Sequence, residues 1–174
     1  QDFNPKTDTT INIHFSANNL SPRKENKIAL QKEFNLKTDS RFPLLGIVGR
    51  LDDQKGLDLI KETIDFLLTE CQIQLVVCGG GDDRYRDLFF NLEKVYPDMV
   101  GTHLLFDPNL PHKIFAGADM ILIPSRFEPG GIVALEAMRY GSVPIVRATG
   151  GLADSVVDYD PTLGVGTGFS FRTY

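Results

Sequence analysis

The sequence contains no tryptophan, two cysteines and three histidines among its 174 residues. Cys71 and Cys78 fall at the ends of a predicted helix and a predicted buried strand, so we interpret them as reduced packing residues rather than a disulfide. His14, His103 and His112 have neither the i, i+4 spacing nor the cysteine partners of a zinc site, and we expect no metal. His112 is expected on the surface, at the start of a helix, and the alternative is that it lines the ligand cleft.

The chain also lacks an excess of positive charge and any long apolar run. Its 18 basic and 23 acidic residues give a net charge of −5, which disfavours nucleic acid as a partner. No apolar stretch approaches the roughly 20 residues that span a bilayer, and the N-terminus lacks the charged-then-apolar order of a signal peptide. We therefore expect no membrane partner and a cytoplasmic location.

Several familiar motifs are missing as well. There is no G-x-x-x-x-G-K-[ST], and 168–172 lacks the second glycine of a nucleophile elbow. Gly79-Gly80-Gly81 follows a predicted strand, but the third glycine of G-x-G-x-x-G would fall on Arg84. The dehydrogenase pattern therefore fails.

What the sequence does contain is an alternation of short apolar strands with helices. Strands that are apolar on both faces and joined by helices predict an α/β fold, a Rossmann-like doubly wound parallel sheet with its ligand at the carboxyl ends of the strands. The predicted strands are 44–48, 73–78, 100–106, 120–123, 143–146 and 168–171, and the predicted helices are 57–68, 85–95, 111–118, 132–139 and 152–157.

The first part of the chain differs in composition from the rest. Residues 1–40 are polar, and only 28–34 has helical apolar spacing, so we interpret 1–40 as an interdomain linker with a short helix. Residues 41–174 form the predicted Rossmann-like domain. A doubly wound domain usually closes with a helix after its last strand, and so we expect this domain to be truncated at the C-terminus.

The most informative stretch runs from Pro124 to Glu136. It joins the end of a predicted strand to a helix start through Gly130 and Gly131, which remove side chains where a ligand could approach backbone N–H groups. Glu128 and Glu136 could accept hydrogen bonds from sugar or ribose hydroxyls. From spacing alone, a plain loop with one solvated and one capping carboxylate is an equally good interpretation.

Two further loops could contribute to the same site. Arg50 and Lys55 follow the first strand and could converge on one anion; each would contribute on the order of 4 kcal/mol to holding a pyrophosphate, before desolvation is subtracted. The alternative is that they form surface ion pairs with Asp52 and Asp53. Thr149 and Gly150 lie in a loop that runs into a helix, where a plain turn is again an equal alternative.

Five groups of residues follow one another in a specific order: Gly49-Arg50 with Gln54-Lys55-Gly56, Ala116-Gly117-Ala118-Asp119, Pro124-Ser125-Arg126-Phe127-Glu128-Pro129, Arg139-Tyr140-Gly141 and Thr149-Gly150-Gly151-Leu152-Ala153-Asp154. Together they resemble the starch and bacterial glycogen synthases. The resemblance covers nearly the whole chain, because Asn4-Pro5-Lys6-Thr7-Asp8 and Asn26-Lys27 with Leu30-Gln31 look like that family's interdomain linker.

The resemblance implies the C-terminal, donor-binding lobe of a GT-B glycosyltransferase. Such an enzyme transfers glucose from ADP-glucose to the nonreducing end of an α-1,4-glucan, with retention and without a metal or other cofactor. Its partners would be the sugar nucleotide, the glucan acceptor and a missing N-terminal lobe, without which we expect this chain to be inactive. A plant or algal source would place it in the plastid.

The resemblance also implies roles for single residues. Arg50 and Lys55 would grip the diphosphate, Glu128 would sit beside the glucose, the backbone of Gly130 and Gly131 would hold glucose hydroxyls, and the amides of Ile132 and Val133 would meet the phosphates.

The chain departs from the family at two positions. The family usually has Cys where this chain has Gly130, and Glu136 restores the E-x7-E spacing of the wider group of retaining sugar-nucleotide transferases, in which the second Glu meets the ribose. A related transferase that uses UDP-glucose or another sugar nucleotide, and a non-catalytic nucleotide- or glucan-binding module, are therefore the alternatives.

Overall fold

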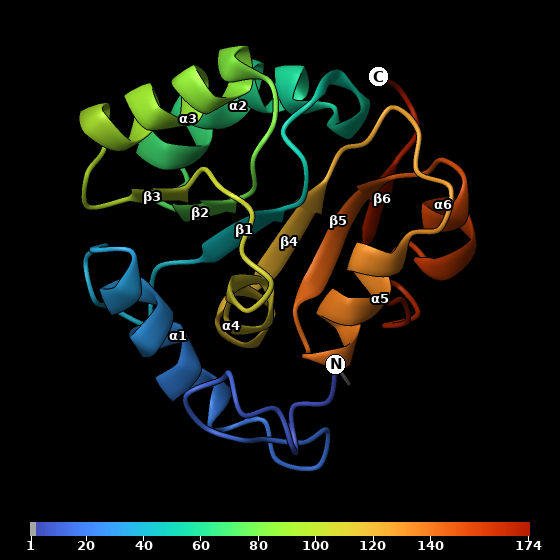
Figure 1. Ribbon diagram of the computed structural model, residues 1–174. Helices are drawn as coiled ribbons and strands as arrows, with labels where there is room; N and C mark the ends of the chain where they lie inside the picture. The colour runs from blue at the N-terminus through green and yellow to red at the C-terminus, as the bar shows by residue number, and fades with distance from the viewer. Residues whose placement is uncertain (1–2) are drawn as a thin grey trace.

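The structure is a computed structural model that describes residues 3–174. A six-stranded parallel sheet with the order β3-β2-β1-β4-β5-β6 runs through it (Figure 1). β1 lies centrally and pairs with β2 through Leu45 and Leu75 and with β4 through Leu45 and Met120. The strands are β1 Leu44–Val48, β2 Gln74–Cys78, β3 Val100–His103, β4 Met120–Ile123, β5 Val143–Arg147 and β6 Phe169–Phe171.

Helices cover both faces of the sheet. On one face, α2 (Leu57–Thr69) and α3 (Asp83–Val95) pack their apolar sides against the strands; α2 buries Leu57, Ile60, Ile64 and Leu68 at helical spacing. The other face is covered by α1 (Arg23–Glu33), α4 (Leu110–Gly117), α5 (Ile132–Arg139) and α6 (Gly151–Ser155). Burial on both faces explains why all five residues of β2 are buried. The predicted Rossmann-like, doubly wound fold is confirmed.

Some predicted boundaries were wrong. β3 ends at His103 rather than at 106, since Leu105 and Phe106 are 63% and 86% exposed and belong to a loop. α1 begins at Arg23 rather than at 28, and α6 covers Gly151–Ser155 rather than 152–157. A short 3-10 turn, η1 (Asp53–Lys55), precedes α2 and was not predicted.

The side chains of two residues also lie where the sequence did not predict them. His112 does lie in the first turn of α4, but it is 1% exposed rather than on the surface. Cys71 is exposed and therefore not a packing residue, whereas Cys78 is buried in β2; both thiols are free.

The segment before β1 packs against the same core as the sheet. Ile11, Phe15, Leu30 and Phe34 belong to the core cluster that also contains residues of α4 and α5. Gly117 lets α1 approach α4 closely, since an added Cβ would lie 2.9 Å from the backbone oxygen of Asn26. The division of the chain at residue 41 stays a prediction.

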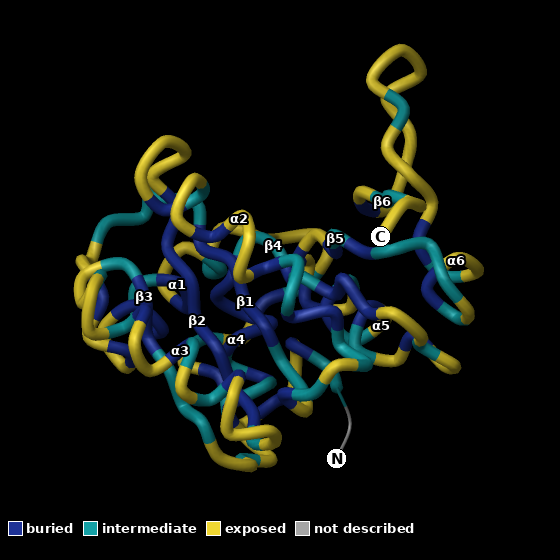
Figure 2. Tube along the Cα trace, turned by 90° about the horizontal axis from the view of Figure 1, so that it is seen from above, coloured by how far each residue is buried: buried dark blue, intermediate teal, exposed yellow. Residues whose placement is uncertain are grey.

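An exposed arm leaves the body between α6 and β6. Its two sides are bridged between Asp160 and Val165, and Figure 2 shows the exposed loop beside β6 standing away from the rest of the chain.

Within residues 3–174, no helix combines the length and the apolar character needed to cross a membrane. In the same residues, no group of three or more His, Cys, Asp or Glu side chains is placed to hold a metal ion.

Candidate functional site

The candidate site lies where the order of the strands reverses. β1 is followed in the chain by β2 on one side, whereas β4, on its other side, is followed by β5 (Figure 1). In open parallel sheets, ligands bind at such a switch point, beyond the carboxyl ends of the strands. Three segments leave the sheet at this edge: the β1 loop (49–56), the β4 turn (124–131) and the β5 loop (148–151).

An ion pair joins the β1 loop to the β4 turn. Lys55 Nζ lies 2.6 Å from Glu128 Oε2, and the two side chains are only 20% and 15% exposed. Lys55 therefore pairs with neither of the two acidic residues that the sequence offered as surface partners, Asp52 and Asp53. An anion that entered here would compete with Glu128 for the ammonium group of Lys55.

Arg50 is held differently. Its Nη1 lies 3.1 Å from Asp52 Oδ2, and its Nη2 donates to Gln54 Oε1 at 3.3 Å, with the side chain 69% exposed. Asp53 is occupied by other groups, because Tyr85 and Arg84 donate to it and lower the pKa of its carboxyl group. The surface pairing considered from the sequence is thus present for Arg50 but absent for Lys55.

The two glycines of the β4 turn differ in whether the backbone conformation and the neighbouring atoms exclude a side chain. Gly131 has a φ of +62°, and an added Cβ would lie 2.9 Å from the backbone of Gly151. Gly130 has no such constraint, since its nearest neighbour would be the Ile132 side chain at 3.5 Å. Gly131 is therefore needed for the shape of the turn, whereas Gly130 leaves space beside it.

The β5 loop packs directly on the β4 turn. Gly151 N donates to the carbonyl oxygen of Glu128 at 2.9 Å, and a Cβ on Gly150 would lie 2.3 Å from that same oxygen. Thr149 accepts a bond from Leu152 N and so begins the turn into α6. Lys55, Glu128, Gly131 and Gly150 are thus brought together by contact.

The remaining predicted residues lie on α5. Ile132 and Val133 form its first turn, whose amides have no acceptor within the helix. Glu136 lies one turn before Tyr140; burial raises the pKa of its carboxyl group, and the nearby His112 acts in the opposite direction. Within residues 3–174, no side-chain hydrogen bond or ion pair joins Glu136 to the three loops.

Sequence reasoning gave no role in the site to four residues that tie its segments together: Gln54, Arg126, Arg147 and Tyr174. Arg147 ends β5 at the same edge as the predicted site, which is the signal that could have found it. Arg126 bonds Asp58 and Tyr174, and the guanidinium groups of Arg126 and Arg147 lie 4.5 and 5.5 Å from the centre of the Tyr174 ring.

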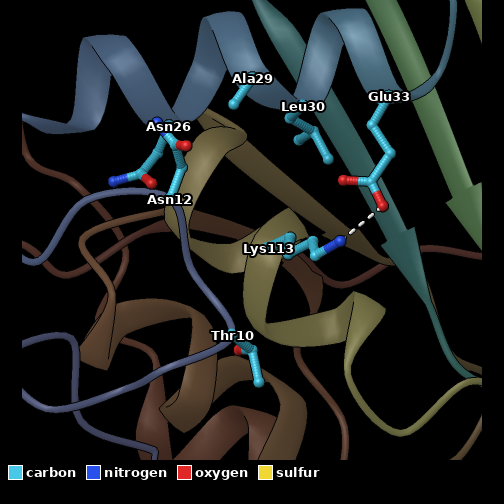
Figure 3. A pocket seen from close by; sticks show the side chains of 7 residues that line it. All are labelled: Thr10, Asn12, Asn26, Ala29, Leu30, Glu33 and Lys113. Carbon is cyan, nitrogen blue, oxygen red and sulfur yellow. Dashed lines mark hydrogen bonds and ion pairs between the residues drawn. The ribbon is translucent and has the colours of Figure 1, made fainter.

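A separate pocket of about 220 Å³ lies between the N-terminal segment, α1 and α4. Lys113 and Glu33 form an ion pair of 2.7 Å at its wall (Figure 3), and the Asn26 amide bonds the backbone of Ile13 in both directions. The described residues that line this pocket belong to none of the three loops.

The sequence is similar to a known family along most of its length. The family model of the glycosyl transferases group 1 matches residues 26–174. A glycogen synthase of Pseudothermotoga lettingae is 47% identical over 99% of this chain, and one of Clostridium novyi is 50% identical over 98%. The chain spans only 35% and 36% of the length of these two relatives.

The structure is similar to solved structures as well. It matches the catalytic domain of starch synthase IV from Arabidopsis thaliana, bound to ADP and acarbose, with a TM-score of 0.89 and 41% identity over 98% of this chain and 36% of the other. A sugar-nucleotide complex of the Anabaena protein HepE, with UDP-glucose, has a TM-score of 0.65 at 17% identity and covers 85% of this chain and 39% of the other. The second match shows the fold alone.

Proposed function

The chain belongs to the glycosyl transferases group 1 family, and on that premise we propose that it is the donor-binding lobe of a glucan synthase. The enzyme would transfer glucose from ADP-glucose to the nonreducing end of an α-1,4-glucan, with retention. The observation that carries the proposal is the Lys55–Glu128 pair, which joins two loops at the switch point of a lobe that is 41% identical to a starch synthase. The rest of the enzyme, including its N-terminal lobe, would complete the site.

We assign the donor contacts as the resemblance implies. Lys55 and Arg50 bind the diphosphate, Glu128 lies beside the glucose, and the amides of Ile132 and Val133 meet the phosphates. Gly130 and Gly131 offer backbone groups to glucose hydroxyls, Glu136 is assigned to the ribose, and Thr149 and Gly150 close the site from the β5 loop.

The chemistry assigned to these residues is electrostatic. As the bond between glucose and the diphosphate breaks, negative charge grows on the departing phosphate oxygens. Lys55 and Arg50 stabilise that charge, and their positions are fixed by Glu128, Asp52 and Gln54 before the donor arrives. Cations on the protein would thus do what a metal ion does in other transferases, and we propose that no metal or other cofactor is needed.

The free thiols of Cys71 and Cys78 are compatible with the proposed cytoplasmic location.

Arg50→Ala in the full-length enzyme tests this assignment. Losing about 3 kcal/mol of transition-state stabilisation should slow turnover with ADP-glucose roughly 10²-fold. Arg139→Ala, at the exposed end of α5, is the matched control and should keep wild-type turnover. Wild-type turnover by Arg50→Ala would refute the proposed role of the β1 loop.

Glu136 supports a second candidate, a related transferase with another donor. A carboxylate eight residues after Glu128 has the spacing typical of the wider group of retaining sugar-nucleotide transferases. Turnover of the full-length enzyme with ADP-glucose, UDP-glucose and GDP-glucose distinguishes the two candidates. Nucleotide binding without turnover of any of the three would instead favour a non-catalytic module.

A further inference from the structure

The β4 turn is held from outside by two side chains to which the proposed function gives no role. We propose that Gln54 and Arg147 are positioning residues that keep this turn in the shape that binds the donor. The inference rests on the proposed function, because it assumes that the turn contacts the sugar nucleotide.

Four consecutive carbonyl groups of the turn, those of residues 125–128, accept hydrogen bonds from the neighbouring loops. Arg147 Nη1 donates to the oxygens of Ser125 and Arg126 at 3.3 and 2.8 Å. Gln54 Nε2 donates to the oxygen of Phe127 at 3.1 Å, and Gly151 N bonds that of Glu128. Such a run of external bonds leaves the turn little freedom to rotate its peptide groups.

Gln54 connects this turn to a predicted donor ligand. Its side-chain oxygen accepts from Arg50 Nη2 while its amide nitrogen bonds Phe127 O, and its own backbone oxygen accepts from Arg126 N at 2.8 Å. One residue therefore sets the distance between the guanidinium group of Arg50 and the chain that carries Glu128.

Arg147 acts from the opposite side, at the end of β5. Its Nε is buried and has no hydrogen-bond partner within the described residues, so part of the guanidinium group is desolvated while Nη1 reaches the two carbonyls. Leaving a buried donor unpaired is unfavourable, and the bonds to the turn are what offset it.

The external bonds to the carbonyl groups also affect the backbone N–H groups at the end of the turn. Within residues 3–174, the N–H groups of Gly130 and Gly131 donate to no protein acceptor. With the carbonyls of residues 125–128 bound from outside, these N–H groups stay available to oxygen atoms of a ligand. Gln54 and Arg147 thereby prepare the turn without touching the donor.

Two substitutions in the full-length enzyme test the proposal. Arg147→Lys keeps the charge but loses the planar guanidinium group, whose Nη1 reaches two carbonyls. Gln54→Met keeps the length of the side chain but loses its amide group. Each should raise the KM for ADP-glucose about tenfold. In hydrogen–deuterium exchange without substrate, each should also speed the exchange of amides in 125–133. The matched controls Arg139→Lys and Gln72→Met, both at exposed positions, should change neither quantity.

The outcomes separate positioning from simple stabilisation. A lower thermal midpoint with an unchanged KM would overturn the proposal, and so would unchanged amide exchange in the turn. A third outcome is a wild-type KM for Arg147→Lys together with a raised KM for an uncharged variant, Arg147→Met. That outcome would also overturn the proposal, because it would mean that Arg147 contacts the diphosphate itself. If the wild-type enzyme transfers glucose from no sugar nucleotide, the proposed function fails. The exchange measurement then decides alone whether the two side chains hold the turn.

Discussion

Gly130 and Gly131 are neighbours in one turn, yet only Gly131 is required by the backbone. Gly131→Ala places a Cβ at a φ of +62° and 2.9 Å from Gly151, and so it should lower the free energy of unfolding by about 2 kcal/mol. Gly130→Ala meets no atom closer than 3.5 Å and should change it by less than about 0.5 kcal/mol. Urea denaturation of both variants measures the difference.

The same pair gives its own control, because the two substitutions add the same methyl group one residue apart. Equal losses of stability would contradict the geometry of the turn. Wild-type stability of Gly130→Ala, combined with loss of donor binding by that variant, would locate the ligand in the space that Gly130 leaves open.

At the scale of elements, a buried carboxylate fastens the N-terminal segment to α4 and α5. Asp8 is 6% exposed and accepts bonds from Thr10, from His112 Nδ1 at 2.6 Å and from the hydroxyl of Tyr140. Phe3 stacks on the His112 ring at 4.1 Å. Burial alone would raise the pKa of Asp8, but these hydrogen bonds outweigh it and lower the pKa from 3.8 to about 2.

The lowered pKa makes stability depend on pH in a defined direction. Asp8 contributes about 2 kcal/mol to the free energy of unfolding, because folding lowers its pKa from 3.8 to about 2. This contribution is complete above pH 3.8 and is lost as the pH falls toward 2. Asp8→Asn should therefore be less stable at neutral pH, and its unfolding free energy should fall less between pH 5 and pH 2. Chemical denaturation across this range measures both, with exposed Asp87→Asn as the control. Parallel pH curves for Asp8→Asn and the wild type would contradict the assignment.

The sequence predicted best the elements that have a regular apolar pattern. The central strands β1, β2 and β4 are short apolar runs in a sheet covered on both sides, and their positions were predicted within one residue. Leu105 and Phe106 extended the predicted third strand because apolar character alone does not distinguish a strand from an exposed loop.

Contacts between distant parts of the chain were not predictable in the same way. His112 was misplaced because its partner Asp8 lies 104 residues away, and no local pattern reports a pairing of that kind. For the candidate site, the sequence indicated which loops meet, since parallel strands end at one edge. It did not indicate that Lys55 pairs with Glu128 or that Gln54 and Arg147 hold the β4 turn, because those contacts depend on the packing of side chains.

At the scale of the whole molecule, two apolar cores lie on the two faces of the sheet, and among the described residues only one of them includes side chains from 3–40. The core beneath α2 and α3 is built from residues 45–100. The core beneath α4 and α5 includes Ile11, Phe15, Leu30 and Phe34. Lys27 also bonds Asp119 at 2.6 Å, so the segment is held by charge as well as by apolar contact.

Removing residues 1–40 is therefore a test of where the folding unit begins. The remaining chain, 41–174, would expose the face of α4 that α1 covers, with Ile114 and Phe115 in the core behind it, and exposed apolar surface of this kind promotes association. We expect 41–174 to bind a hydrophobic dye, to sediment as aggregates and to melt over a broad range, whereas 1–174 should melt cooperatively. The reason is physical rather than catalytic, since none of the proposed donor ligands lies in the deleted part. If 41–174 stays monomeric and unfolds cooperatively at the same midpoint as 1–174, the first 40 residues are a linker and the domain begins at residue 41, as the composition of the sequence predicts.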